Sequence, residues 1–285
     1  AGILILEGDA GTGKNVLVDI FSHFTNRETM TFSCNFQTEK EDLTYAFHFD
    51  PKKGTYAVDS RLIEMLQTPG SVIVLDEINT LPPGVTKMLN PLLDYRRTLY
   101  LPDGREVKAH DSVVIVGTMN PQHYLGVKAL SQEVISRSRV MNVDYPAEKR
   151  ADGTWAPYEA EMLAKAFPRL QNFTHEEFER AWDFAINQKL DNEGDKLLDE
   201  ATQADLKRLH RIVRSANRVR EAYRAFHGGT STDPLEFVFS IREGTQIASE
   251  LRYQEDALRA IQDVVLPKIA DPQEKKRVKT ILENI

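Results

Sequence analysis

An apolar run followed by a glycine-rich loop is the segment of this chain whose residue types most directly imply chemistry. Residues 3–6 are Ile-Leu-Ile-Leu, and residues 8–15 read Gly-Asp-Ala-Gly-Thr-Gly-Lys-Asn. Glycines let a loop direct several N–H groups at phosphate oxygens, and a lysine here reaches the β- and γ-phosphates. A following helix adds its positive N-terminal end. The segment predicts a triphosphate site made by Gly8, Asp9, Ala10, Gly11, Thr12, Gly13, Lys14 and Asn15.

The last residue of this loop departs from the usual pattern. The residue after the lysine is ordinarily Ser or Thr, whose hydroxyl ligates magnesium, whereas this chain has Asn15. An amide oxygen can also ligate magnesium. We therefore keep Asn15 as a candidate metal ligand.

A pair of carboxylates follows a second apolar run. Residues 72–75 are Val-Ile-Val-Leu, which is typical of a buried central strand, and Asp76 and Glu77 come directly after them. Open α/β sheets bind ligands at the carboxyl ends of their strands. We expect Asp76 to hold magnesium, directly or through water, and Glu77 to orient and deprotonate the water that attacks the γ-phosphate. Each motif alone also fits a plain turn or strand end, but the two together favour nucleotide chemistry.

A third apolar run, residues 112–117, leads to Thr118-Met119-Asn120-Pro121. The amide of Asn120 is expected to hold the attacking water, and the alternative is a turn-forming Asn before proline. Shortly before this run, residues 98–107 alternate in polarity around Asp103-Gly104. That pattern predicts a β-hairpin.

The elements that must position these residues follow from the wider pattern. Residues 1–146 alternate short β-branched runs with amphipathic helical stretches, which predicts an α/β domain with a parallel sheet covered by helices on both faces. Residues 147–285 predict an all-helical domain, with residues 152–157 as the linker. Its helices are expected at 157–166, 174–189, 202–226, 237–250, 253–266 and 272–284.

Composition narrows the class of protein. The chain has 285 residues, 41% hydrophobic and 28% charged, which is ordinary for a globular protein of two domains. Its apolar runs are too short to span a bilayer. A lone cysteine, Cys34, excludes an internal disulfide and favours a buried strand residue in a cytoplasmic protein. Because the chain starts at Ala1, directly before a strand, we expect a fragment or a processed protein.

The net charge of the chain indicates which classes of binding partner are favoured. A net charge of −7 argues against a duplex DNA backbone as the main ligand. The basic stretches at 207–211 and 214–224 leave nucleic acid open, although such stretches more often form the solvated face of a helix. Nucleic acid is therefore an alternative that the charge does not favour.

Residues 8–15, 75–79, 118–121 and 130–146 together resemble those of AAA+ ATPases, and the similarity is greatest to the MoxR-like and dynein-related (midasin-type) group. That group carries an insertion in its second helix, and residues 41–66 resemble it. The resemblance implies a P-loop NTPase sheet followed by a helical lid domain, with ATP and Mg²⁺ bound. It also implies a homo-oligomeric ring, for which we expect a hexamer.

The resemblance also assigns roles to arginines. In such families, the arginine that closes the helix after the third motif reaches the γ-phosphate of a neighbouring subunit. Arg137 occupies that place, and Arg139 is the alternative because the usual Arg-Phe is replaced by Arg137-Ser138-Arg139. Arg242 resembles the arginine of the Ser-x-Arg motif that senses the nucleotide from the helical domain. Exposed surface arginines are the competing interpretation for all three.

The resemblance implies an ATP-hydrolysing ring protein that remodels or matures a protein partner, often with a von Willebrand A-type partner. The inserted segment and the hairpin at Asp103-Gly104 are candidate contact surfaces. Two alternatives remain open. One is a nucleotide-driven motor subunit of a nucleic-acid system, which a strong preference for GTP or stimulation by DNA would favour. The other is a nucleotide-gated scaffold with little turnover, which the departure at Asn15 makes worth weighing.

Overall fold

The computed structural model describes residues 2–52, 54–121, 130–189 and 198–285. The chain divides into two compact units, Ala1–Asp144 and Tyr145–Ile285. This division lies two residues before the boundary predicted from the sequence.

The first unit is built on a parallel sheet of five strands. Four parallel pairings join them in the spatial order β2 (Thr29–Ser33), β5 (Val72–Asp76), β8 (Val114–Met119), β1 (Leu4–Glu7) and β9 (Arg139–Asn142). Every residue of β5 before Asp76 is buried, as expected for a strand covered on both faces. Because the strands are parallel, their carboxyl ends lie at one edge of the sheet.

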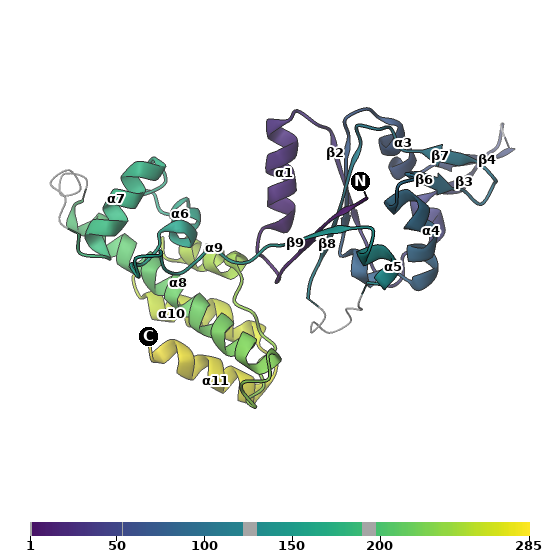
Figure 1. Cartoon of the computed structure of the whole chain (residues 1–285). Coiled ribbons are helices and arrows are strands. Elements are labelled where there is room, and N and C mark those ends of the chain that lie inside the picture. The colour runs from purple at the N-terminus through teal and green to yellow at the C-terminus, as the bar shows by residue number, and fades with distance from the viewer. Residues whose placement is uncertain (1, 53, 122–129, 190–197) are drawn as a thin grey trace. The chain divides into compact units, whose positions relative to one another are not determined.

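Helices cover both faces of this sheet (Figure 1). On one face lies α1 (Lys14–Phe24), whose Val18 packs against β1, β5 and β8. The other face carries a larger core that includes Ile5 and Ile73. It is covered by α3 (Arg61–Gln67), α4 (Pro83–Leu93) and α5 (Gln132–Ile135), with the short η1 (Ile78–Thr80) after β5. The predicted α/β fold with helices on both faces is confirmed.

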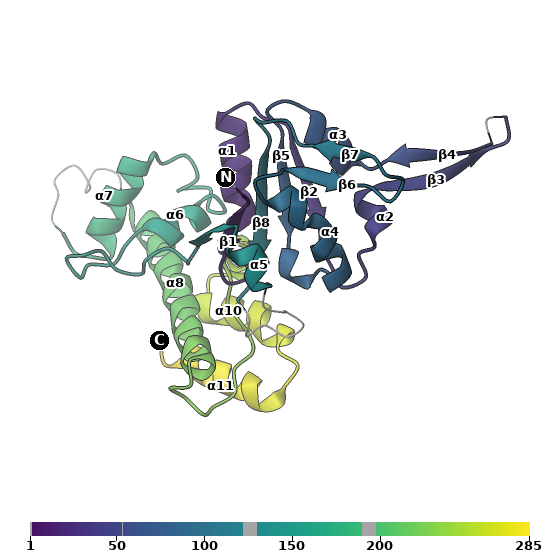
Figure 2. The same cartoon turned by 45° about the vertical axis from the view of Figure 1, so that its right-hand side comes forward.

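Two antiparallel hairpins are inserted into the connections of the sheet. After α2 (Lys40–Leu43), β3 (Tyr45–Asp50) pairs with β4 (Gly54–Asp59) along its whole length, and this hairpin extends away from the sheet (Figure 2). The hairpin expected around Asp103-Gly104 is formed by β6 (Thr98–Tyr100) and β7 (Glu106–Lys108). The Arg105 guanidinium donates to both oxygens of Asp59, at 2.9 and 2.7 Å, and so joins the two hairpins.

The described secondary structure of the second unit is helical, apart from a single β-bridge between Lys149 and Trp155. Its elements are α6 (Tyr158–Ala164), α7 (His175–Ala185), α8 (Glu200–His227), α9 (Ile241–Glu250), α10 (Ala257–Val265), η3 (Leu266–Lys268) and α11 (Pro272–Glu283). A capping box at Thr174 begins α7, and Asp271 caps α11, whose first residue is Pro272. None of the helices in the described residues is long and apolar enough to cross a membrane.

Three helix boundaries differ from the prediction by four residues, and the others by no more than two. α9 begins at Ile241 rather than 237, since the side chain of Ser240 caps its first turn. α10 begins at Ala257 rather than 253, since the Asp256 carboxylate accepts from two N–H groups of its first turn. α7 ends at Ala185 rather than 189. Hydrophobic periodicity therefore predicts too early a start for a helix whose first residue is fixed by a capping side chain.

A buried ion pair connects the helices of the second unit. The Arg220 guanidinium on α8 donates to both carboxylate oxygens of Glu159 on α6, at 2.7 and 2.8 Å, and to the Phe239 carbonyl at 2.7 Å. It also lies over the ring of Tyr145, 3.6 Å from the centroid. Arg220 and Glu159 are only 3% and 2% exposed. Thus Arg220, which lies in a stretch predicted to be a solvated face, is a core residue.

We expect Arg220→Met to lower the free energy of unfolding of this unit by about 3–5 kcal/mol, because the Glu159 carboxylate is left buried without its partner. Both tryptophans of the chain lie in the second unit, so tryptophan fluorescence during urea unfolding measures this change. Arg218→Met is the matched control. Arg218 pairs with Glu221 on the exposed side of the same helix, where such pairs contribute about 0–1 kcal/mol. Equal losses in the two variants would contradict the role of Arg220.

The predicted linker, residues 152–157, lies inside the second unit instead. Its Trp155 carbonyl accepts from the Trp182 indole N–H at 2.9 Å. The ring of His210 contacts both tryptophans edge-on, with centroids 4.8 and 5.5 Å away. Burial, together with the nearby charge of Arg214, lowers the pKa of His210 to about 4. The segment is therefore a packed part of the helical unit.

We expect His210 to remain neutral in the folded protein down to about pH 4. An unfolded histidine has a pKa of about 6.5, so the unfolded state binds the extra proton between these values. The free energy of unfolding should therefore fall as the pH falls from about 6.5 to about 4. An NMR titration of the ring protons measures the pKa directly. His175, whose pKa is raised by its hydrogen bond to Glu161, is the internal comparison. A His210 midpoint near 6.5 would contradict the prediction.

Candidate functional site

The glycine-rich loop joins the carboxyl end of β1 to the start of α1. The Gly8 N–H donates to the Met119 carbonyl at 3.2 Å, and a Cβ on Gly8 would lie only 2.0 Å from the Val143 carbonyl oxygen. Gly13 caps α1 with a φ of 88°, which side chains other than glycine rarely adopt. The loop is thus held against the strands on both sides of β1.

Lys14 is folded back over this loop. Its Nζ donates to the carbonyls of Gly8 and Asp9, at 2.7 and 2.9 Å, and to Asn120 Oδ1 at 3.0 Å. Within the loop, the Thr12 hydroxyl donates to the Asp9 carbonyl at 3.0 Å. The structure therefore brings together Lys14 and Asn120, which the sequence places at the ends of two different strands.

Asn15 contacts the carboxylate that ends β5. Its Nδ2 donates to Asp76 Oδ1 at 3.1 Å, while its own Oδ1 is buried and has no hydrogen-bond partner. A carboxylate and an unpartnered amide oxygen side by side are the hard oxygen donors that Mg²⁺ prefers. These two residues therefore fit a magnesium ion.

Glu77 stands next to Asp76 in a strained backbone conformation. Its φ and ψ are 57° and 42°, the left-handed region that non-glycine residues seldom occupy and that is enriched at functional sites. The Glu77 N–H donates to the Thr118 hydroxyl at 3.1 Å, and that hydroxyl donates to Asp76 Oδ1 at 2.5 Å. Glu77 is exposed, so its carboxylate is accessible to water.

Cys34 lies beside the same carboxylates. It follows β2, is 3% exposed, and donates its N–H to the Asp76 carbonyl at 2.8 Å. Burial, together with the negative charges of Asp76 and Glu77, raises the pKa of its thiol to about 12. The thiol is therefore a buried packing group rather than a nucleophile.

The three arginines singled out from the sequence lie after α5, on β9 and on α9. Arg137 forms ion pairs with Glu133 and Asp94, at 3.2 and 3.4 Å. Arg139 begins β9 at the edge of the sheet, with its side chain exposed. Arg242 lies in the first turn of α9, in the second unit, and is also exposed. All three residues are exposed.

Two residues of the site were not assigned a role from the sequence. Thr118 connects Asp76 to the backbone of Glu77, as described above. Asn79 donates from Nδ2 to the Asn120 carbonyl at 3.0 Å. Two features of the sequence could have pointed to them. Thr118 is a hydroxyl residue in an otherwise apolar strand, and Asn79 is an amide residue shortly after two carboxylates.

Comparison with known proteins relates the first unit to a protein family. Residues 3–138 match a family model described as an AAA domain of the dynein-related subfamily. Midasin of Giardia intestinalis is 34% identical over 154 residues, which are 53% of this chain and 3% of that protein. The protein CbbQ of Hydrogenophilus thermoluteolus is 32% identical over 145 residues, or 50% of this chain and 54% of CbbQ.

An uncharacterised protein of Staphylococcus epidermidis is 28% identical over 147 residues, covering 50% of this chain and 55% of that protein. The matches thus span about half the length of these two bacterial relatives and a small part of midasin. They agree with the resemblance found in the motifs. Residues 3–138 of this chain form an AAA domain that belongs to the dynein-related, MoxR-like group of AAA+ proteins.

Proposed function

We propose that this chain binds ATP with Mg²⁺ and hydrolyses it. The observation that carries the proposal is one contact network at the carboxyl edge of the sheet. In it, Lys14 Nζ donates to Asn120 Oδ1 at 3.0 Å, and Asn15 Nδ2 donates to Asp76 Oδ1 at 3.1 Å. Glu77 follows Asp76 directly in the chain. These residues come from three segments that are distant in sequence, so chance alone does not explain their convergence.

The loop and Lys14 would bind the phosphates. The ammonium now donates to neutral carbonyl and amide oxygens, and hydrogen bonds to charged phosphate oxygens are stronger. The helix that starts at Lys14 adds its positive end. The phosphates therefore have both a cation and a row of N–H donors at the end of β1.

Asn15 and Asp76 would hold the magnesium, which neutralises phosphate charge when bound. Glu77 would take a proton from the attacking water, and Asn120 would orient that water. The Thr118 hydroxyl would keep both carboxyl-bearing residues in place, since it bonds to the Asp76 side chain and the Glu77 backbone.

We expect Glu77→Gln to retain the ATP affinity of the wild type and to lower the hydrolysis rate by at least about 10²-fold, because the amide cannot accept the proton of the water. Fluorescent-nucleotide binding and phosphate release measure the two properties. Glu41→Gln, which changes an exposed carboxylate on α2, is the matched control and should leave both unchanged. Wild-type hydrolysis by Glu77→Gln would remove Glu77 from this role.

We also propose that the chain assembles into a ring, with a hexamer as the expected form. Exposed apolar surface on α1 supports assembly, because such surface commonly marks an interaction site. The outer side of α1 exposes between 42% and 83% of each of five apolar residues: Val16, Leu17, Ile20, Phe21 and Phe24. In such a ring, Arg137 or Arg139 would reach the γ-phosphate of the neighbouring subunit, and Arg242 would contact the nucleotide of its own chain.

We expect Arg137→Ala to lower hydrolysis by about 10³–10⁵-fold, the contribution of an arginine supplied in trans. The decisive measurement mixes Arg137→Ala with Glu77→Gln. Each variant is inactive alone, but mixed rings contain interfaces that pair an intact Glu77 with an intact Arg137, so activity should return. Arg139→Ala is tested in parallel, and loss there alone would assign the role to Arg139. Full activity of both single variants would contradict a shared site.

The partner on which the ring acts is proposed to be a protein, including a von Willebrand A-type partner. The β3–β4 hairpin supports this proposal, since it extends from the sheet (Figure 2) and exposes 71% of Phe47 and 74% of Phe49. Tyr56 and Val58 are also exposed on it. Remodelling or maturation of such a partner would occur in the cytoplasm, which suits the single buried thiol of Cys34.

A nucleotide-gated scaffold with little turnover is the second candidate. It is favoured by Asn15, whose Nδ2 is engaged with Asp76 where a hydroxyl is usual. Tight ATP binding with a negligible hydrolysis rate at high protein concentration would support the scaffold over the hydrolase.

A further inference from the structure

A buried carboxylate at the end of α4 pairs with two arginines of the first unit. Asp94, which is 4% exposed, accepts from Nε and Nη2 of Arg96 at 3.1 and 2.7 Å, and from the Arg96 N–H at 2.8 Å. Its Oδ2 also accepts from Nη1 of Arg137 at 3.4 Å. One carboxylate therefore holds two guanidinium groups next to each other, although the two arginines are far apart in the sequence.

Both guanidinium groups keep donors for a ligand. The side chains of Arg96 and Arg137 are 41% and 36% exposed. A guanidinium carries five N–H donors in a planar fork, and Asp94 engages only one edge of Arg96. Among the residues that the structure describes, Nη1 of Arg96 and Nη2 of Arg137 have no hydrogen-bond partner. The pair is therefore anchored on one side and accessible on the other.

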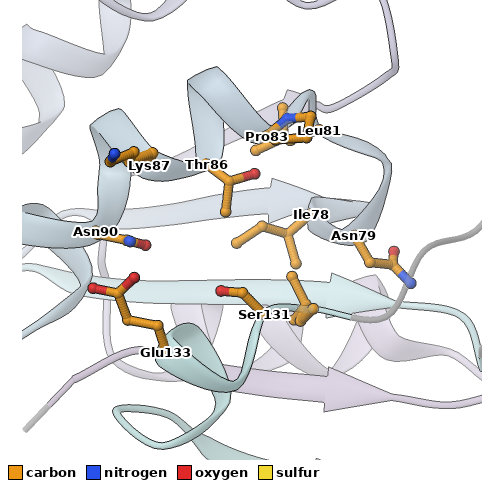
Figure 3. Close-up of a pocket in the computed structure, with 10 residues that line it drawn as sticks. Ile78, Asn79, Leu81, Pro83, Thr86, Lys87, Asn90, Ser131 and Glu133 are labelled. Carbon is orange, nitrogen blue, oxygen red and sulfur yellow. The ribbon is translucent and has the colours of Figure 1, made fainter.

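The two carboxylates that contact Arg137 differ in how firmly they are fixed. Asp94 is buried and held by Arg96, whereas the side chain of Glu133, 3.2 Å from Arg137, is 54% exposed. Glu133 also lines a pocket between α4 and α5 (Figure 3), so its carboxylate has space to move away. A terminal phosphate carries about two negative charges against one for a carboxylate, so it competes with Glu133 for the guanidinium. Asp94 is thus the fixed support, and Glu133 is an exchangeable partner.

The surface around the two arginines has the composition of a protein interface. Tyr95, which stands between Asp94 and Arg96 in the chain, is 87% exposed. Tyrosine and arginine are enriched in interfaces, where their large side chains provide much of the binding energy. An aromatic ring and two anchored guanidinium groups therefore lie together on a surface that suits contact with a second chain.

We propose that Asp94 is the positioning residue for this pair of arginines, and that Arg96 binds the triphosphate of a neighbouring copy together with Arg137. The inference rests on the proposed function, in which an arginine acts in the site of the adjacent subunit. It adds a second cation from the same subunit and names the group that sets the position of both. Because one guanidinium can bind two phosphate oxygens, two of them side by side can contact more than one phosphate group.

The first test measures ATP hydrolysis by two variants of the intact chain. We expect Arg96→Gln to lower the rate by about 10²–10³-fold, as for the loss of one donor to charge in the transition state. Asp94→Asn should lower it by about 10²-fold, the cost of a misplacement of about 1 Å. ATP affinity at protein concentrations too low for assembly should not change, because the loop and Lys14 of the same chain are intact.

Two matched controls should keep the wild-type rate. Asp103→Asn changes a carboxylate that accepts from Nε and the N–H of Arg105, at 2.7 and 3.0 Å, which is the same local arrangement as at Asp94. Arg61→Gln removes an exposed arginine that pairs with two carboxylates, Glu28 and Glu64. Equal losses in the variants and their controls would overturn the proposal.

Mixing the variants separates positioning from folding. Activity should return when Asp94→Asn or Arg96→Gln is mixed with Glu77→Gln, because one subunit then supplies an intact Glu77 and its neighbour supplies both arginines. It should not return when Arg96→Gln is mixed with Arg137→Ala, because no subunit then has both. A variant whose own nucleotide site is misfolded would stay inactive with Glu77→Gln, and that result would overturn the proposal.

The outcomes distinguish this inference from the proposed function. Wild-type rates in both Asp94→Asn and Arg96→Gln, with Arg137→Ala inactive, would overturn the pairing and leave the shared site standing. Full activity of Arg137→Ala would contradict the shared site and this inference with it. If the chain binds ATP without hydrolysing it, the readout is ATP affinity, which should rise with protein concentration in the wild type and not in Arg96→Gln. An equal rise in both, or none in the wild type, would overturn the proposal.

Discussion

The position of β8 between β1 and β5 is the constraint on which the candidate site depends. The register pairs Leu6 with Thr118 and Leu75 with Gly117, so Thr118 and Asn120 arrive at the edge where the other two strands end. From there the Thr118 hydroxyl reaches Asp76 and the Asn120 amide reaches Lys14. A slip of one residue would turn these side chains to the opposite face.

Local patterns in the sequence predict much of this arrangement. The strands around residues 4, 72 and 114 are short β-branched runs buried on both faces, and the alternation around Asp103-Gly104 predicts the hairpin that is observed. Residues at the carboxyl ends of such strands must meet at one edge, which is why Asp76 and Asn120 could be named in advance. Their chemical roles remain predictions, because contacts alone do not demonstrate catalysis.

What the sequence could not predict depends on contacts between distant residues. Arg220 looks like any other basic residue of an exposed helix, and only the packing of α6 against α8 makes it a core residue paired with Glu159. The helix starts at Ile241 and Ala257 depend on single caps that periodicity overlooks.

Asn15 shows how an unusual residue can be accommodated by the same constraint. A serine or threonine hydroxyl at this position would offer a single oxygen atom to serve both the metal and the neighbouring carboxylate. The amide separates the two tasks, because Nδ2 holds Asp76 while Oδ1 stays without a partner. Asp76 Oδ1 therefore accepts from both Asn15 and Thr118, which fixes the carboxylate before any ion binds. On the proposed assignment of magnesium to Asn15 and Asp76, oxygens that are already oriented need less reorganisation to receive the metal.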